Sequence, residues 1–403
     1  MSALSVFIMC GMLRAQEDSN IIIGKKMRWR SAVLNKEMEL SMHLPSDYED
    51  SDESYPVLIT FQTHFEQVSG AVKNLYEYGL IPKMIVCRID NYEFGYLTPT
   101  KVESDPNSGQ ADLFLRFFME ELFPYLDSNY RTQPYRIVFS NSWGAMFAVY
   151  AILTKPDVFN AAIASIPWVM YDDDRRFMIT NAERFLNQAR YRNFLYMTMD
   201  NESDLLPELD RFIQILRRHP KEGLEWKYHY WPEEDHTSTP YRSIYSGLRA
   251  IFSGWNKIPD DIAWNGLEGI KKHEAALNKK FGYNIGVSTG GLRMAGQENQ
   301  NADRFDTAIA IYKYAIEKNP NDAFAYVTLG RAYEAAGQLH LAKNAFEKGY
   351  QIAVAISHPQ MKWVKGFLDR IEERLRKKMV SLYKFYYQPL HWTDTFLIDI
   401  SFF

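Results

Sequence analysis

A strand-like run that passes through a serine into a helix-like run constrains the fold of this chain most. Residues 136–139 are mostly apolar and of strand type, and residues 145–153 are small and apolar, as in a buried helix. Between them stands the sequence Ser140-Asn141-Ser142-Trp143-Gly144. A serine at the tip of a sharp strand-to-helix turn is typical of a nucleophile elbow, whose usual pattern is Gly-x-Ser-x-Gly. Here Ser140 replaces the first glycine.

Small residues are needed two positions before and after such a serine, because the strand and the helix pass each other closely at a strained turn. Ser140 and Gly144 meet this requirement, so the pattern predicts Ser142 as a nucleophile. Taken alone, the same residues also fit an ordinary turn between a strand and a helix.

Length and composition favour two domains with sizeable cores. The chain has 403 residues, of which 46% are hydrophobic and 15% aromatic. The formal net charge of -4 does not favour nucleic acid as a partner. Cys10 and Cys87 are the two cysteines, which are too few for a disulfide framework or a cysteine-based metal site.

The first residues resemble a secretory signal. Residues 5–13 are apolar, and Leu13-Arg14-Ala15 before Gln16 fits a cleavage site, although no basic residue precedes the apolar run. Residues 1–15 are therefore expected to be a signal peptide, and the protein to be secreted or periplasmic. The alternative is an unprocessed N-terminus and a cytoplasmic protein. We expect no later segment to span a membrane.

Apolar runs and helical periodicity alternate along residues 27–256. The expected strands are 38–44, 55–61, 84–89, 135–139, 161–166, 194–199 and 226–231. The expected helices are 65–78, 111–123, 145–153 and 206–218, with Pro124 ending the second. Strands that alternate with helices predict a mostly parallel α/β sheet.

Polar residues follow several of these strands, at the edge of a parallel sheet where ligands bind. They are Gln62-Thr63-His64, Ser142, Trp168, Asp200-Asn201-Glu202 and Glu234-Asp235-His236. A serine, acids and a histidine thus follow in the chain order of an α/β-hydrolase triad.

The second half of the chain contains a repeat. Ala308, Tyr312 and Ala315 are followed 34 positions later (342 − 308) by Ala342, Phe346 and Gly349. This is the period of a tetratricopeptide repeat, although two unrelated helices would be the alternative. Only about one and a half units are clear, too few for a free-standing solenoid, so we expect the repeats to dock on a neighbour.

These patterns predict an α/β-hydrolase fold followed by a small all-α tetratricopeptide-like domain. The expected boundaries are 1–15 for the signal, 27–256 for the hydrolase domain, 257–290 for a linker, 291–380 for the helical domain and 381–403 for a tail of unknown structure. A helix with a basic outer face is expected at 361–379.

Several stretches in a shared order resemble the esterase family of α/β-hydrolases, which includes the siderophore esterases and relatives of S-formylglutathione hydrolase. They are Tyr55-Pro56-Val57-Leu58, Leu97-Thr98-Pro99-Thr100, Glu121-Leu122-Phe123-Pro124-Tyr125, Tyr130-Arg131-Thr132, residues 153–159 and Glu234-Asp235-His236-Thr237-Ser238. Together they cover about residues 30–255. Some members of the family carry C-terminal tetratricopeptide repeats. The chain departs from the family at Ser140-Asn141, where Gly-His is common, and at Phe61-Gln62-Thr63, where Leu-Asp-Gly is frequent.

The resemblance and the chain order imply a role for each residue. Ser142 is the expected nucleophile and His236 the expected base. Glu202 is the first choice for the acid that orients His236, with Asp204 and Asp200 left open.

The oxyanion donors are expected to be the backbone N–H of Trp143 and one near Gln62 or Thr63. Trp168 and Tyr171 line the substrate pocket or belong to the core. His64 precedes the serine and lies on the wrong strand for the base.

The prediction is a serine carboxylic-ester hydrolase that works through an acyl-enzyme on a small-molecule ester. No cofactor and no metal ion are expected, because the sequence shows no metal-ligand spacing and no phosphate loop. A protein partner for the repeats is a further expectation. The alternative is a non-catalytic binding or scaffold protein that keeps the hydrolase fold and uses its repeats.

Overall fold

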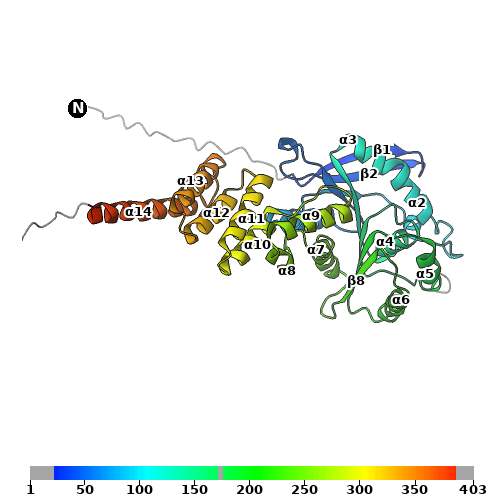
Figure 1. Cartoon of the computed structure of the whole chain (residues 1–403). Helices are drawn as coiled ribbons and strands as arrows, with labels where there is room; N and C mark the ends of the chain where they lie inside the picture. The colour runs from blue at the N-terminus through cyan, green and yellow to red at the C-terminus, as the bar shows by residue number, and fades with distance from the viewer. Residues whose placement is uncertain (1–21, 171–175, 387–403) are drawn as a thin grey trace, which may run out of the picture.

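The computed structural model describes residues 22–170 and 176–386 (Figure 1). The predicted signal peptide, Tyr171 and residues 387–403 of the predicted tail lie outside the described residues. The secreted or periplasmic location therefore stays a prediction. Among the helices that the structure describes, none combines the length and the apolar character needed to cross a membrane.

An eight-stranded sheet forms the centre of the first domain. Its strands are β1 (Lys25–Ser31), β2 (Lys36–His43), β3 (Tyr55–Phe61), β4 (Ile85–Ile89), β5 (Thr132–Asn141), β6 (Ala161–Ser165), β7 (Asn193–Met199) and β8 (Leu224–Tyr230). They lie in the order β1-β2-β4-β3-β5-β6-β7-β8. The pairs β1–β2 and β2–β4 are antiparallel, and the others are parallel. All seven predicted strands are present, and β1 is an addition that the sequence reading missed.

Helices cover both faces of the sheet, which explains why its central strands are nearly continuous apolar runs. The helices of this domain are α1 (Phe65–Glu77), α2 (Ala111–Phe117), α3 (Phe123–Asn129), α4 (Ser142–Thr154), α5 (Phe177–Gln188), α6 (Leu206–Arg218) and α7 (Thr239–Ile251). Residues of α2, α4, α5 and α6 share one apolar core with the sheet, and residues of α1 and α7 share the other.

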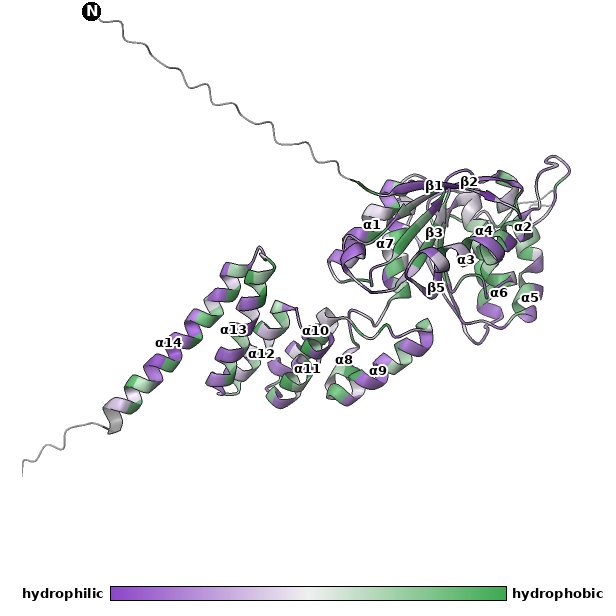
Figure 2. Ribbon diagram, turned by 90° about the horizontal axis from the view of Figure 1, so that it is seen from above, coloured by the Kyte–Doolittle hydropathy of each residue, from purple (hydrophilic) through white to green (hydrophobic). Residues whose placement is uncertain are grey.

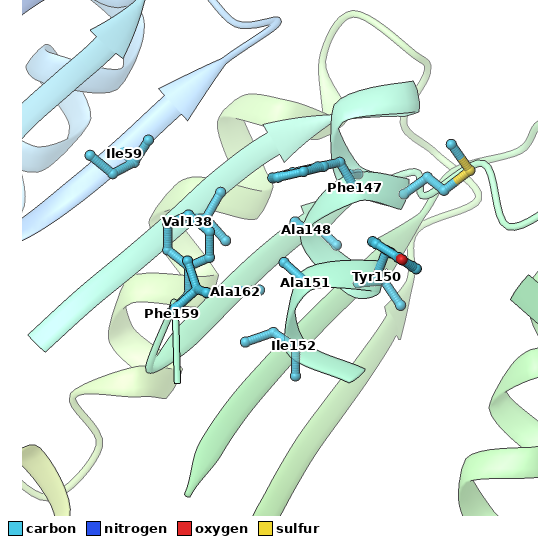
Figure 3. Close-up of a cluster of buried hydrophobic side chains, with 14 of the residues drawn as sticks. Ile59, Val138, Phe147, Ala148, Tyr150, Ala151, Ile152, Phe159 and Ala162 are labelled. Atoms are coloured by element: carbon cyan, nitrogen blue, oxygen red, sulfur yellow. The ribbon is translucent and has the colours of Figure 1, made fainter. Parts of the chain in front are cut away.

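Helix α4 is buried along almost its whole length, as its small apolar residues require. Figure 3 shows Phe147 and Ala148 of α4 beside Val138 of β5, with Phe159 and Ala162 nearby; each of these five side chains is at most 1% exposed. The packing fixes the N-terminus of α4, where Ser142 stands, against the carboxyl end of β5.

The predicted helix at 111–123 was wrong in its C-terminal boundary. Helix α2 continues through a π-helical turn (Phe118–Leu122) into α3, which ends at Asn129. Pro124 lies in the first turn of α3, directly after this π-helical turn, where the regular α-helical hydrogen-bond pattern is already interrupted.

The segment predicted as a linker, 257–290, contains two helices. They are α8 (Asp260–Trp264) and α9 (Gly266–Phe281), and Ile270, Leu277 and Phe281 of α9 are buried in the same core as α1 and α7. The prediction missed them because Gly266 and Gly269 interrupt an otherwise helical pattern.

Five further helices form a row that leads away from the sheet (Figure 2). They are α10 (Thr289–Asn301), α11 (Phe305–Lys318), α12 (Ala323–Ala335), α13 (Leu339–Ala355) and α14 (Met361–Tyr386). Helix α11 packs on α9 and shares its core, so the repeats dock on the first domain as expected. Helix α14 extends past the predicted boundary at 380 and takes the first residues of the predicted tail.

The two helical hairpins α10–α11 and α12–α13 pack in the same way. A Cβ atom on Gly296 of α10 would lie 2.4 Å from the Tyr312 ring of α11, and one on Gly330 of α12 would lie 2.5 Å from the Phe346 ring of α13. Both the glycines and the aromatic residues are 34 positions apart (330 − 296 and 346 − 312). Each glycine thus lets a bulky ring fill the contact between paired helices, which explains the repeat in the sequence.

Candidate active site

The turn from β5 into α4 has the strained geometry of a nucleophile elbow. Ser142 is the first residue of α4 and has a φ of 55°, in the left-handed region that non-glycine residues rarely adopt. Its side chain is buried, with 5% of the residue exposed. Strain of this kind persists where the surrounding structure enforces it, and it is common at functional sites.

Ser140 and Gly144 show why small residues are needed around the turn. A Cβ atom on Gly144 would lie 2.0 Å from Ser140 Oγ, so no larger residue fits at Gly144 without movement. Ser140 Oγ donates a hydrogen bond to the carbonyl oxygen of Phe61, at 2.6 Å. The residue that replaces the usual glycine therefore ties β5 to the end of β3.

Gln62 makes a second tie between the same two segments. It follows β3 with a φ of 54°, and its Oε1 accepts a hydrogen bond from the backbone N–H of Gly144, at 2.7 Å. Thr63 is held beside it by a hydrogen bond between Thr63 Oγ1 and Thr60 Oγ1, at 2.6 Å. Trp143, the second residue of α4, carries one of the first helical amides, which have no partner inside the helix. The predicted oxyanion residues Trp143, Gln62 and Thr63 therefore lie on the two segments that these hydrogen bonds join.

The structure brings Glu202 and His236 together. Glu202 Oε1 and His236 Nδ1 form a short hydrogen bond between the loop after β7 and the loop after β8. Asp200 lies behind this pair, and its Oδ1 accepts a hydrogen bond from the Glu202 backbone N–H at 3.1 Å. Asp204 instead accepts a hydrogen bond from Ser203. Of the three acids left open by the sequence, Glu202 is the one that contacts the histidine.

Asp200 is fully buried, and burial raises the pKa of its carboxyl group above the ordinary value; the hydrogen bond from Glu202 N–H and the positive field of His236 oppose the shift. Its Oδ2 has no hydrogen-bond partner. Asp200 therefore supports the loop that carries Glu202, although burial of its carboxylate disfavours the charged form.

The Nε2 atom of His236 faces the elbow. It lies 3.4 Å from Nδ2 of Asn141, the residue directly before Ser142. The hydrogen bonds of the described residues include none between Ser142 Oγ and His236. Nucleophile and base hydrogen bonds are often long or absent without substrate, and the contact with Asn141 places the imidazole next to the residue that precedes the serine.

Asp235 fixes the backbone on which His236 stands. Its Oδ1 accepts hydrogen bonds from the Thr237 N–H (2.8 Å), the Thr237 hydroxyl (2.6 Å) and the Ser238 N–H (2.9 Å). These bonds lower the pKa of Asp235 to about 2. The loop before α7 is thus held by a local side-chain-to-backbone turn.

Three aromatic side chains form a wall beside the elbow. The rings of Trp143 and Trp168 are 4.2 Å apart, and Phe94 meets Trp143 edge-on at 5.2 Å. The Nε1 of Trp168 is buried without a hydrogen-bond partner. Trp168, for which the sequence left a pocket role and a core role open, packs against the apolar core that α4 shares with the sheet. Phe94 lies in the long loop after β4 and could not be assigned from the sequence.

A cavity of about 390 Å³ opens beside His236. Its lining includes Gln62, His64, Arg88 and Tyr241. Arg88 lies near the carboxyl end of β4 and pairs with Asp90 at 3.3 Å. Arg88 was not predicted as a site residue, although a charged residue within an apolar strand was a visible signal. His64, the residue directly before α1, also lines this cavity.

Asp200, Glu202 and His236 are also the one group in the described part of the chain whose donor atoms could hold a metal ion, since these atoms lie within 4.8 Å of one another. A metal ion on His236 Nδ1 would have to displace the hydrogen bond to Glu202. The hydrogen bonds between Glu202 Oε1 and His236 and from the Glu202 N–H to Asp200 are sufficient to hold these three side chains together.

The sheet topology, with a serine at the turn after a central strand and an acid and a histidine after the last two strands, is that of the α/β-hydrolase fold. Residues 31–204 match the model of the family described as Putative esterase, and residues 311–344 match a Tetratricopeptide repeat model. The resemblance noted in the sequence is thereby confirmed.

Two curated proteins are similar to part of the chain. The ferri-bacillibactin esterase of Bacillus subtilis is 30% identical over 89 residues, which are 22% of this chain and 30% of that protein. The siderophore enterobactin esterase of Emericella nidulans is 31% identical over 104 residues, which are 23% of this chain and 32% of that protein. The chain thus spans about a third of the length of the curated relatives it matches.

Solved structures share the fold. An IroE-like serine hydrolase from Shewanella oneidensis has a TM-score of 0.62 at 23% identity, covering 73% of this chain and 99% of its own. An uncharacterised protein from Capnocytophaga ochracea has a TM-score of 0.59 at 16% identity, covering 87% of this chain and 99% of its own. A siderophore hydrolase from Aspergillus nidulans has a TM-score of 0.51 at 16% identity, covering 60% of this chain and 98% of its own.

Proposed function

We propose that this protein is a serine carboxylic-ester hydrolase that uses Ser142, His236 and Glu202. The observation that carries the proposal is the hydrogen bond between Glu202 and the His236 Nδ1, with the opposite ring nitrogen facing the strained turn at Ser142. The family match of residues 31–204 supports the same reaction class.

In the proposed mechanism, Ser142 Oγ attacks the ester carbonyl while His236 Nε2 takes its proton. His236 then gives this proton to the leaving alcohol, and an acyl-enzyme remains on Ser142. Water, activated by the same imidazole, releases the acid. Glu202 holds Nδ1 protonated and stabilises the imidazolium that forms in both steps.

The tetrahedral oxyanion is held by the backbone N–H of Trp143 and by one from Gln62 or Thr63. Helix α4 adds the positive end of its dipole at this point. A single donor of this kind is typically worth a factor of about 10²–10³ in kcat. The ties that Ser140 and Gln62 make between β3 and the elbow support this arrangement despite the departures from the family pattern.

For the substrate we propose esters with an aromatic group. The rings of Trp143 and Trp168 pack against each other next to the elbow, and the buried Trp168 Nε1 has no hydrogen-bond partner among the described residues, so it can donate to a polar substituent on a substrate ring. The names of the two curated relatives make siderophore esters a reasonable second group to assay.

The test compares hydrolysis of p-nitrophenyl acetate and p-nitrophenyl benzoate by the wild-type protein and by Ser142→Ala. We expect activity that Ser142→Ala abolishes, since loss of the nucleophile in a serine protease costs on the order of 10⁶ in kcat. We also expect a higher kcat/KM for the benzoate. A fluorophosphonate probe should label the wild type and not the variant.

Equal background rates in both proteins, with no labelling of Ser142, would favour the alternative of a non-catalytic scaffold. That alternative has one observation in its favour, which is the absence of a Ser142–His236 hydrogen bond among those of the described residues. We further propose that the repeats contact another protein, as the match to a repeat model suggests.

A further inference from the structure

The strand β8 forms one edge of the sheet and has one neighbouring strand. It pairs with β7, and no other strand that the structure describes pairs with it. At one end, the carbonyl oxygen of Gly223 accepts a hydrogen bond from the Asn193 N–H, at 2.9 Å. At the other end, the Trp231 N–H donates to the carbonyl oxygen of Met199, at 2.8 Å. Because backbone groups alternate between the two sides of a strand, the odd-numbered residues of β8 bond to β7 and the even-numbered ones face outward.

The outward backbone amides of β8 can bond to a further strand. In the described part of the chain, no group accepts a hydrogen bond from the outward N–H of Trp226 or Tyr228. The strand contains no proline, glycine or bulge, which are devices that keep an edge from pairing. Its odd-numbered face borders an open hollow of about 330 Å³, lined by Lys227, His229 and Arg249 of α7. This edge is therefore open to another strand and to its side chains.

The two edges of the sheet differ in their charge pattern. The strand β1 at the other edge has four basic residues among seven, so two copies of it would repel each other. The strand β8 carries one acid, Glu225, and one lysine, Lys227. They are two positions apart and so lie on the same face of the strand. An acid and a base in this arrangement are complementary to the same pair on an antiparallel copy.

One antiparallel register of two β8 strands matches these charges. A two-fold pairing centred on Glu225 would oppose two carboxylates, and one centred on Lys227 would oppose two ammonium groups. A pairing centred on Tyr228 would place Lys227 opposite His229. The pairing centred on Trp226 instead places Glu225 of each copy opposite Lys227 of the other, twice. It also suits the backbone, because Trp226 faces outward and can exchange two hydrogen bonds with its copy.

The hollow beside β8 has an excess of positive charge that a second copy would reduce. Among the described residues, neither Lys227 nor Arg249 has a carboxylate at salt-bridge distance. Glu225 pairs with Lys280 at 3.3 Å, but its side chain is 63% exposed. An exposed pair of this kind contributes little, so Glu225 can also contact a lysine of another molecule.

We propose that two copies of this chain associate through β8, which pairs antiparallel about Trp226 and extends the sheet from one copy into the other. Glu225 of each copy contacts Lys227 of the other. The two Trp226 backbones exchange hydrogen bonds, and the Tyr228 N–H of each copy donates to the Leu224 carbonyl oxygen of the other. The association is independent of the proposed esterase reaction, because no residue of β8 belongs to the candidate active site.

The test is sedimentation velocity of the full chain between about 1 and 100 µM, the range of moderate affinities. The wild type should form a dimer as the concentration rises. Lys227→Glu and Glu225→Lys each turn two attractive pairs into two repulsive ones, so each variant alone should associate at least about tenfold more weakly. An equimolar mixture of the two variants should dimerise as the wild type does, because every Glu then faces a Lys again.

Lys25→Glu makes the same charge change on the exposed edge strand β1 and should dimerise normally. Thermal melting checks that each variant is folded, and a second readout needs no substitution: the Trp226 and Tyr228 amides of the wild type should exchange hydrogen more slowly as the dimer forms. A wild type that stays monomeric, a mixture of the two variants that does not associate, or a Lys25→Glu variant that loses the dimer would overturn the proposal. Amide exchange at Trp226 that is independent of concentration would overturn it as well.

Discussion

Replacing Gln62 with leucine removes the hydrogen bond that ties the loop after β3 to the start of α4. Gln62 Oε1 accepts from the Gly144 N–H at 2.7 Å, and Gly144 is buried. Leucine has nearly the same size and no acceptor. The backbone groups of Trp143, Gln62 and Thr63 all remain, but one of the two bonds that hold their segments together is lost.

The expected losses of stability and of kcat follow from the unpaired Gly144 N–H and from the freedom that the oxyanion donors gain. A buried N–H without an acceptor costs about 1–3 kcal/mol of stability. Complete loss of one oxyanion donor costs a factor of about 10²–10³ in kcat. Because the variant keeps both donors and only frees them to shift, we expect a smaller loss in kcat, on the order of tenfold, or about 1.4 kcal/mol. KM should change little.

Gln62→Glu separates the structural role from the catalytic one. Its carboxylate can still accept from Gly144 and is favoured by the helix dipole, so stability should be kept. The same negative charge lies beside the developing oxyanion, so kcat should fall below that of Gln62→Leu.

The assay measures p-nitrophenyl ester hydrolysis together with urea unfolding, with Gln188→Leu at the exposed end of α5 as the control. Wild-type kcat and wild-type stability in Gln62→Leu would refute the reasoning. Higher activity in Gln62→Glu than in Gln62→Leu would refute the electrostatic part.

Three further substitutions test the neighbouring groups. Ser140→Gly restores the usual elbow glycine but removes the 2.6 Å bond to Phe61, so urea unfolding should show a loss of about 1 kcal/mol with activity retained; unchanged stability would contradict this. Glu202→Gln should lower kcat by on the order of 10³–10⁴. An equal loss of kcat in an Asp204→Asn variant would show that the assignment of Glu202 as the acid is wrong. For Asp200, the raised pKa means that the native state binds more protons than the unfolded state as the pH rises from the ordinary value of 3.8 through the raised native value. Wild-type stability is therefore lost as the pH rises through this region, and urea unfolding of Asp200→Asn should show a stability advantage that grows from pH 4 to pH 7; a constant difference would rule this out.

The fold class followed from the sequence because its signals are local. Buried parallel strands are short apolar runs, and the turn at Ser142 needs small neighbours, so both could be recognised without tertiary information. Strand β1 was missed because it is an edge strand with exposed positions, and its pattern, residues 25–31, carries four basic residues and little apolar alternation. The continuation of α2 through Pro124 was missed because proline signals both the end and the start of a helix.

The candidate site could be predicted only as far as the order of residues allows. One loop carries Asp200, Glu202 and Asp204, and the sequence cannot show which carboxylate meets His236, because that depends on the path of the loop. The side-chain role of Gln62 was also out of reach. It depends on a positive φ and on a partner 82 positions away, which no local pattern encodes.

The apolar core that joins α1 and α7 to the helices α9 to α12 has a consequence for how this chain can be divided. Glu274 of α9 reinforces the joint, because it is buried and accepts hydrogen bonds from the Val287 N–H (3.1 Å) and the Tyr314 hydroxyl, with Lys318 3.3 Å away. We therefore expect the two parts to melt as one cooperative unit, and a cut after residue 256 would leave apolar surface on both fragments. In evolutionary terms, the repeats are not an interchangeable module here. They could be inherited, lost or swapped only together with α9, the helix that the sequence had suggested was merely a connection.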